Sequence, residues 1–386
     1  MHSTVDNVRE RLAYALFAML LVFAWQWLTV RINYGGNWTA LYCTGGLQGV
    51  PAALSAEHVY QFPNSHGYDG QMYHYIAHDP LMRNPDVSRF VDAQRMRYRR
   101  VLLPGLAYLL AGGRQQWIDP VFYALILLSV GAGVYWTAAL GRSPAWGLMF
   151  VLLPATLVSI DRMTVDVALT AFAAGFAWHV RQPSWRLFLI LAAAILTRET
   201  GLLLLVAWCS YLVLAHRWKN AARYSLAAVP AFAWYAYIQV HTPAKAIPKD
   251  LIPFAAIWDN FWHPAGYPAT VRLAWLAMLS DRLALCGMVA AFALAIYYNR
   301  KRWRDPVALA TFWFVAMGVF VQLQDIWTSV YNFGRVYSPV LLFLGLESID
   351  RGSWIGLAPL ALEWPRIALQ LGTQILGMFG VAGPRH

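Results

Sequence analysis

A single aspartate stands in a short polar segment of a chain that is otherwise strongly apolar. The segment GYDGQMYHYIAHDP covers residues 67–80, and its Asp69 follows a turn signal at His66 and Gly67. The apolar spacing after it predicts an amphipathic helix lying at a membrane interface. A carboxylate in that position can take a proton from an attacking hydroxyl group, which is general-base chemistry. The same position also suits an N-cap that only closes the helix.

Histidines in the same segment raise the question of a metal. His74 and His78 lie four residues apart, so a helix places them on one face, and His66 and Asp79 lie close in sequence. Neither a cysteine cluster nor an HExxH motif accompanies them, so we expect no cofactor, with a divalent metal bound by these residues as the less favoured alternative. We interpret Tyr73 and His74 as neighbours of the reacting groups and Asp79 as the end of the helix.

Four arginines follow in the segment RMRYRRVLLP, residues 95–104, directly before an apolar stretch; they are Arg95, Arg97, Arg99 and Arg100. Guanidinium groups bind phosphate in a bidentate manner, so this cluster can hold a phosphate or diphosphate. Attraction to anionic lipid headgroups is the alternative explanation.

Ionisable residues also interrupt apolar segments further along the chain. Arg198 and Glu199 lie between AAAIL and GLLLL, where charged side chains are costly and usually face a cavity or one another. A self-contained structural ion pair is the alternative. Arg335 begins another apolar segment and is either an interfacial anchor or a second phosphate ligand.

The junction SIDRMTVD, residues 159–166, contributes further charges. Asp161, Arg162 and Asp166 all fall between two apolar segments. They can serve as helix caps or as part of a polar site.

The composition places these residues in a membrane protein. Of 386 residues, 59% are hydrophobic and only 13% are charged, and the mean hydropathy is +0.45. The net charge of +11 falls largely in short connections between apolar segments, so it indicates topology and not binding to nucleic acid. The three cysteines imply no disulfide framework. We therefore predict an all-α, polytopic membrane protein.

Apolar segments give about 11 transmembrane helices. A first helix at 12–30, expected to be retained, is followed by segments at 118–140, 144–160, 165–180, 186–215, 221–241, 271–298, 306–324, 336–347 and 354–380. The segment 101–113 is too short to span and is predicted to be interfacial or re-entrant. We predict that 186–215 forms two short helices that meet at TRET. With both assignments every strongly basic connection lies in the cytoplasm; one span at each place is the less favoured alternative.

On this topology the unusual polar residues share the extracytoplasmic side, which predicts a single site there. The order of a first helix, YDGQMYHYIA, YRRVLLPGLAYLL, DRMTVD, LTRETGLLL and GRVYSP resembles the GT-C superfamily of membrane glycosyltransferases. The likeness is to the branch around PIG-V-type mannosyltransferases and related bacterial proteins. It implies a seven-helix catalytic module over 1–241 with its first extracytoplasmic loop at 31–117, followed by a loop and C-terminal helices over 242–386.

The resemblance also implies a reaction. Such enzymes transfer a sugar from a polyprenyl-phosphate donor to a glycan, lipid or protein acceptor on the outer side of the cytoplasmic (inner) membrane. Asp69 would be the general base, with Asp166, or Asp161 as an alternate, as the acidic residue of the second loop. Four arginines would bind the donor phosphate, and other polar residues would contact the sugar or acceptor; these are Arg99, Arg100, Arg198 and Arg335 for the phosphate, and Tyr73, His74, Asp161 and Glu199 for the contacts.

The chain departs from members with an acidic pair in the first loop, since Gly70 and Gln71 follow Asp69. This departure argues against a metal requirement. A lipid or anionic-solute transporter or flippase is the alternative function, although polar residues gathered at one face fit alternating access poorly. A noncatalytic assembly role is a third hypothesis.

Overall fold

The chain is almost entirely helical, as the sequence predicted. The computed structural model describes residues 2–243, 252–267 and 270–381 and is 76% helical. The α-helices are α1 (His2–Asn33), α2 (Asp69–His78), α3 (Pro85–Ser88), α4 (Gln94–Arg97), α5 (Leu102–Leu110), α6 (Gln115–Leu140), α7 (Pro154–Arg162), α8 (Asp166–His179), α9 (Trp185–Thr197), α10 (Leu202–Leu214), α11 (Trp218–Ser225), α12 (Val229–His241), α13 (Ala255–Trp262), α14 (Val271–Asn299), α15 (Pro306–Phe320), α16 (Val330–Arg351) and α17 (Ala358–Met378).

Short 3₁₀ helices and one small sheet complete the secondary structure of the described residues. The 3₁₀ helices are η1 (Trp38–Tyr42), η2 (Ala52–Glu57), η3 (Pro144–Leu152), η4 (Glu199–Gly201), η5 (Leu226–Ala228), η6 (Gln324–Thr328) and η7 (Ile355–Leu357). Strands β1 (Thr44–Gly45) and β2 (Gln61–Phe62) pair in parallel, with Thr44 opposite Gln61. Both strands lie between α1 and α2 and shape the loop that leads to Asp69.

Three helices are long and apolar enough to cross a membrane: Val8–Asn33, Gln115–Leu140 and Val271–Asn299. Shorter apolar helices lie at Trp185–Thr197, Glu199–Leu214 and Pro306–Phe320. These apolar helices are compatible with the predicted membrane protein, and the nearly all-helical content is the part of the predicted architecture that the structure shows.

The segment predicted as one span at 144–160 is broken. It consists of η3 and α7, which are bent by 60° relative to each other and pass the criteria for a span only as a pair. Leu153 between them is extended, with φ −71° and ψ 140°, because Pro154 follows it and disfavours helical backbone in the preceding residue. The apolar segment predicted at 144–160 is therefore helical but bent, and its crossing of the membrane stays a prediction.

The two segments with an ambiguous number of spans, 186–215 and 101–113, have the predicted helices. Helix α9 ends at Thr197 and α10 begins at Leu202, with Arg198 in extended conformation between them (φ −161°, ψ 144°). The predicted break at TRET is therefore present. Helix α5 has nine residues, too few to span a bilayer.

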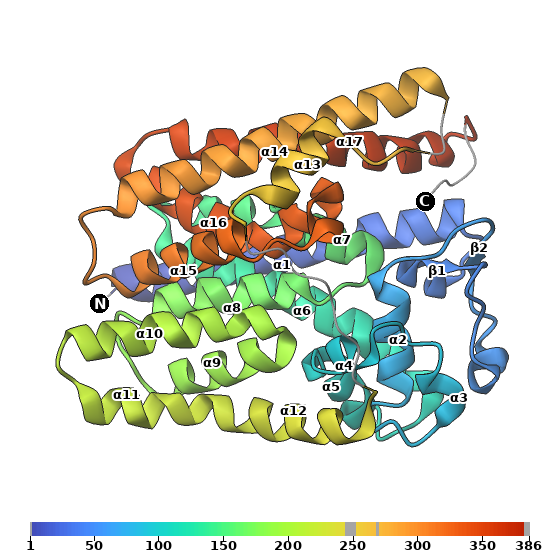
Figure 1. Ribbon diagram of the computed structural model, residues 1–386, viewed down its shortest axis with the longest axis horizontal. Helices are drawn as coiled ribbons and strands as arrows, with labels where there is room; N and C mark the ends of the chain where they lie inside the picture. Colours follow the sequence, from blue (N-terminus) through green and yellow to red (C-terminus); the bar gives the residue numbers. More distant parts are fainter. Residues whose placement is uncertain (1, 244–251, 268–269, 382–386) are drawn as a thin grey trace.

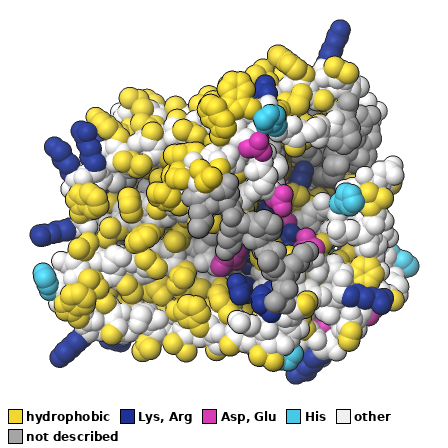
Figure 2. All heavy atoms as spheres, in the orientation of Figure 1, with side chains coloured by type: hydrophobic (Ala, Val, Ile, Leu, Met, Phe, Trp, Pro, Cys, Tyr) yellow, Lys and Arg dark blue, Asp and Glu magenta, His cyan; other side chains and the backbone are white. Residues whose placement is uncertain are grey.

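The two ends of the molecule differ in character. Figure 1 shows α2, α3, α4 and α5 gathered at the right, whereas the basic connections α10–α11 and α14–α15 turn at the left. On the face in Figure 2, hydrophobic side chains cover the helices between these ends, and Lys and Arg side chains project at the left edge. The basic connections thus lie away from the long first loop, as the topology requires.

Small residues allow the helices to pack closely. A Cβ atom on Gly133 of α6 would lie 2.2 Å from the Phe150 ring of η3. A Cβ atom on Gly287 of α14 would lie 2.9 Å from Leu362 Cβ of α17. Close backbone approach at glycine is a common basis of helix packing in membranes.

The C-terminal helices pack directly on the N-terminal ones. Asn33 Nδ2 at the end of α1 donates to Gln374 O of α17 over 3.0 Å, and Ala155 N of α7 donates to Ser338 Oγ of α16 over 2.8 Å. The division into 1–241 and 242–386 stays a prediction. Residues 244–251 and 268–269 of the loop 242–270 lie outside the described residues.

Candidate functional site

Asp69 is the first residue of α2, and two arginines hold its side chain. The N-cap is the extended Tyr68, and no side chain caps the helix. Arg97 Nη1 lies 2.8 Å from Asp69 Oδ1, and Arg335 Nη2 lies 2.5 Å from Asp69 Oδ2. The interpretation of Asp69 as an N-cap was therefore wrong, because its carboxylate engages arginines of α4 and α16 instead of the amides of its own helix.

Arg335 joins two carboxylates. Its Nη1 donates to Asp166 Oδ2 over 3.2 Å, while Nη2 contacts Asp69. The other oxygen of Asp166 pairs with Arg198, so both oxygens of this buried carboxylate are occupied. Segments more than 260 residues apart in sequence, as Asp69 and Arg335 are, thus meet at one point.

A second group of charges lies beside this one. Arg100 binds Glu199 in a bidentate manner, with Nε to Oε2 at 3.0 Å and Nη2 to Oε1 at 2.5 Å. Arg100 Nη1 also donates to Tyr73 Oη over 3.1 Å. Tyr73 lies one helical turn after Asp69, so helix α2 contributes a side chain to each of the two groups of charges.

The network is largely removed from water. The exposed fraction of the side chain is 15% for Asp69, 6% for Arg335 and 1% for Asp166. Burial on its own would raise the pKa of Asp69, but Arg335, Arg97 and Arg100 hold it well below its usual range. Asp69 is therefore ionised at neutral pH. It stays a weak base as long as Arg97 and Arg335 contact its carboxylate.

Aromatic rings pack against the guanidinium groups of Arg162 and Arg335. The guanidinium carbon of Arg162 lies 4.4 Å from the ring centre of Tyr68 and 4.4 Å from that of Tyr331, and Arg335 lies 5.0 Å from the Tyr68 ring. Tyr68 Oη donates to Tyr331 O over 2.7 Å. Sequence reasoning did not name Tyr68, and it gave Arg162 only as a helix cap or part of a polar site.

Several predicted residues lie elsewhere. Arg99 places its guanidinium 5.2 Å from the Tyr235 ring and makes no described contact with Asp69, whereas Arg97, two residues earlier, does. Asp161 pairs with Gln374 of α17. The structure thus brings together Asp69, Asp166, Arg198 and Arg335, with Arg100, Glu199 and Tyr73 adjoining.

Gly70 and Gln71 follow Asp69 where a second acidic residue would complete an acidic pair. Both contribute to the packing of α2. A Cβ atom on Gly70 would lie 2.1 Å from Arg162 O and 2.9 Å from Tyr42 O, so only glycine lets α2 approach the end of α7 this closely. Gln71 Oε1 accepts from Gly45 N over 3.0 Å. These two residues position Asp69 against the network.

Asp79 ends the helix, as predicted. It is the C-cap residue of α2, and its two carboxylate oxygens accept from Arg83 N (2.9 Å) and Asn84 N (2.8 Å). Both carboxylate oxygens of Asp79 thus accept hydrogen bonds within the turn. His66, the other residue considered with it, is exposed.

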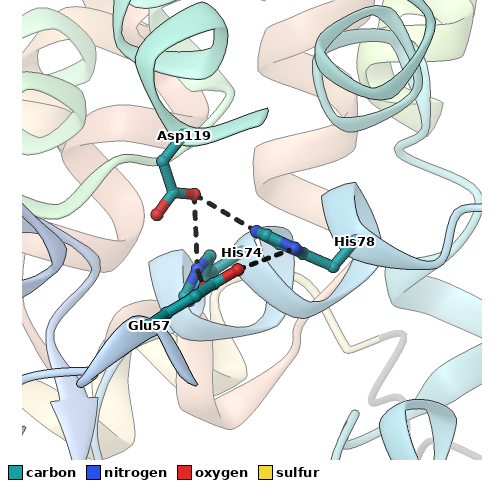
Figure 3. Close-up of side chains that lie close together, drawn as sticks. All are labelled: Glu57, His74, His78 and Asp119. Atoms are coloured by element: carbon teal, nitrogen blue, oxygen red, sulfur yellow. Dashed lines mark hydrogen bonds and ion pairs between the residues drawn. The ribbon is translucent and has the colours of Figure 1, made fainter. Parts of the chain in front are cut away.

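His74 and His78 point away from the arginines into a separate cluster. Figure 3 shows them converging with Glu57, the last residue of η2, and Asp119, the fifth residue of α6. Burial on its own would lower the pKa of His74, but the carboxylates of Asp119 and Glu57 raise it to about 9. His74, predicted as an acceptor or sugar contact, is fully buried here and stacks on the ring of Tyr42.

Comparison of the chain with models of protein families, with curated protein sequences and with solved structures found no match.

Proposed function

We propose that the protein is an inverting GT-C-type glycosyltransferase of the cytoplasmic membrane. It would transfer a hexosyl or pentosyl group from a polyprenyl-phosphate donor to an acceptor on the extracytoplasmic side. The observation that carries the proposal is the sharing of Arg335 between Asp69 and Asp166 in a buried network at one end of the helices. This arrangement supports the proposal because a carboxylate able to act as a base and several guanidinium groups able to bind phosphate lie close together.

The arginines are the groups that would bind the donor phosphate. Arg335 and Arg198 are nearly buried, with 6% and 5% of their side chains exposed, and desolvated guanidinium groups attract a phosphate more strongly than solvated ones. As the bond between sugar and phosphate breaks, negative charge grows on the departing phosphate, and these arginines would stabilise it. Arg97 takes the place that Arg99 had in the prediction from sequence.

Donor binding would also activate the base. Arg335, Arg97 and Arg100 hold the pKa of Asp69 below its usual range, against the opposite effect of burial. A phosphate that draws Arg335 or Arg97 toward itself weakens this hold, so the carboxylate becomes a better base when the donor is bound. Asp69 would then take the proton of the acceptor hydroxyl on the face of the sugar opposite the phosphate, which inverts the anomeric centre.

The topology of the proposal has about 11 membrane crossings. It counts the three long apolar helices, the bent pair η3 and α7 and the three shorter apolar helices. The predicted segments at 165–180, 221–241, 336–347 and 354–380 supply the others. A seven-helix module over 1–241 would then carry the base and most of the arginines, and 242–386 would supply Arg335.

The test separates sugar transfer from transport. The full-length protein is reconstituted into vesicles with polyprenyl-phosphate hexoses and pentoses that carry a labelled sugar, in membranes that supply lipid and glycan acceptors. The proposal predicts labelled product with inverted configuration at the anomeric carbon. Movement of the intact donor across the bilayer without transfer would instead support a flippase or transporter, and neither activity would support a noncatalytic role.

A further inference from the structure

Four potential metal ligands converge at the face of α2 that does not carry Asp69. His74 and His78 lie one turn apart on α2, Glu57 ends η2, and Asp119 is the fifth residue of α6. One ligand atom from each residue lies within 4.8 Å of the others. Three segments separated in sequence therefore deliver two imidazoles and two carboxylates to one point (Figure 3).

The separations match a small tetrahedral site. His74 Nε2 lies 3.2 Å from Glu57 Oε2 and 3.3 Å from Asp119 Oδ1, and His78 Nε2 lies 3.4 Å from Asp119 Oδ1. Zinc bound by nitrogen and carboxylate oxygen at about 2.0–2.1 Å in a tetrahedron has ligand atoms about 3.3 Å apart. We propose that Glu57, His74, His78 and Asp119 bind a divalent transition metal, with Zn²⁺ as the preferred ion.

The buried imidazole of His74 supports the proposal independently. The residue is fully buried, its Nδ1 makes no hydrogen bond with the described residues, and its Nε2 faces the two carboxylates at ion-pair distance without hydrogen-bond geometry. Glu57 Oε2 is buried and also lacks a hydrogen-bond partner there. Buried polar atoms in folded proteins are nearly always hydrogen-bonded, so atoms without such bonds that face one another indicate a missing common partner.

Neighbouring side chains orient the ligands. The Tyr42 hydroxyl donates to Asp119 Oδ1 over 2.9 Å, and the Tyr42 ring stacks on His74 with centres 4.2 Å apart and planes at 8°. Gln115 Oε1 contacts His78 Nδ1. Contacts of this kind fix ring orientation around metal ions.

An ion can reach the cluster from solvent. A depression of about 480 Å³ is lined by Ala56, Glu57, Arg114, Gln115 and Gln116, so two residues that contact the histidines form part of its wall. The carboxylates are the exposed members, at 20% for Glu57 and 15% for Asp119, whereas the His74 side chain has no exposure.

Four protein ligands complete a tetrahedral shell, which is typical of structural sites and leaves no position for a substrate. The metal would fasten α2 to η2 and α6, while the opposite face of α2 presents Asp69 and Tyr73 to the arginines. The inference does not depend on the proposed sugar transfer, because it concerns the anchoring of the helix.

Cobalt gives a direct readout. The full-length protein is purified in detergent without a metal-affinity step, treated with a chelator and titrated with Co²⁺ alone, then with Zn²⁺. We expect saturation at one equivalent with the strong visible bands of tetrahedral Co²⁺, loss of those bands when one equivalent of Zn²⁺ is added, and a Zn²⁺-dependent rise in the midpoint of thermal unfolding.

Variants locate the site. His74→Ala and Glu57→Gln should lower Co²⁺ affinity by at least about tenfold. His66→Ala, at an exposed histidine of the same loop, should leave it unchanged. If a ligand variant does not fold, the wild-type spectrum still decides. Folded wild-type protein without saturable tetrahedral bands, or equal binding by His74→Ala, would overturn the proposal and leave an ion-pair cluster.

Discussion

Arg335 and Asp69 lie 266 positions apart in sequence, yet Nη2 of the arginine contacts Oδ2 of the aspartate at 2.5 Å. The same guanidinium reaches Asp166, so one side chain of α16 joins the start of α2 to the start of α8. A carboxylate held in this way is a weak base until an anion competes for its arginine. With the proposed function, this relationship would make the site respond to a phosphate-bearing ligand.

Arg97 and Arg99 provide a test of which arginine serves the site. Arg97→Lys should lower sugar transfer by about tenfold or more, because one ammonium cannot bind in the bidentate way that a guanidinium can. The matched variant Arg99→Lys should retain most activity, since Arg99 lies over Tyr235 and makes no described contact with Asp69. Rates of labelled sugar transfer for the two variants measure this. A larger loss in Arg99→Lys would contradict the placement of Arg97 in the site.

The pH dependence of stability reports the pairing of Asp69. Its pKa is lowered in the folded protein relative to about 3.9 in an unfolded chain, so its stabilising contribution is present above that value. The contribution is lost as the pH falls through the lower, folded value. Wild type should therefore unfold at a higher temperature than Asp69→Asn at pH 7, and the difference should shrink below about pH 4. Thermal unfolding of both proteins across this range measures it, and a difference that grows on acidification would refute the pairing.

Gly70 should tolerate no side chain. Gly70→Ala places a Cβ atom 2.1 Å from Arg162 O, which forces α2 away from α7, and we expect a loss of about 1–3 kcal/mol in the free energy of unfolding. Gly372→Ala in α17 is the matched control, because a Cβ atom there meets nothing within 4 Å. It should be neutral or slightly stabilising. Chemical unfolding compares the two, and equal stabilities would show that α2 does not approach α7 so closely.

Glu363 is a fully buried carboxylate in α17 whose oxygens lack hydrogen-bond partners among the described residues. Glu363→Met should raise the free energy of unfolding by about 1–3 kcal/mol, because it removes an unsatisfied polar group at similar volume. Glu363→Gln keeps the polarity and should change it much less. A lower thermal midpoint for Glu363→Met would show instead that the carboxylate has a stabilising partner.

Sequence reasoning located the segments of the site better than their contacts. Charges such as Arg198 within apolar surroundings must face a partner or a cavity, so their importance follows from composition alone. Which partner each charge takes depends on packing between distant helices. Arg335 and Asp166 meet only because α16 lies against α8, and no spacing in the sequence specifies that contact.

Local backbone geometry also limited which site residues could be predicted from the sequence. Arg97 ends the short helix α4 and Arg99 lies in the following turn, so a change of two residues decides which side chain reaches Asp69. The shared face of His74 and His78 follows from helical periodicity. Their partners Glu57 and Asp119 come from η2 and α6, and the three-dimensional arrangement was needed to bring them into one cluster.

The central claim is that Asp69 takes the acceptor's proton during sugar transfer. The most direct measurement compares initial rates of transfer from the labelled polyprenyl-phosphate sugars for wild type, Asp69→Asn and Asp92→Asn, with donor binding measured in parallel. Asp92 also pairs with Arg97, but 45% of its side chain is exposed, so it serves as the matched control. The account predicts that Asp69→Asn binds donor and loses transfer by about 100-fold or more, whereas Asp92→Asn stays active. Transfer by folded Asp69→Asn at the wild-type rate would contradict it.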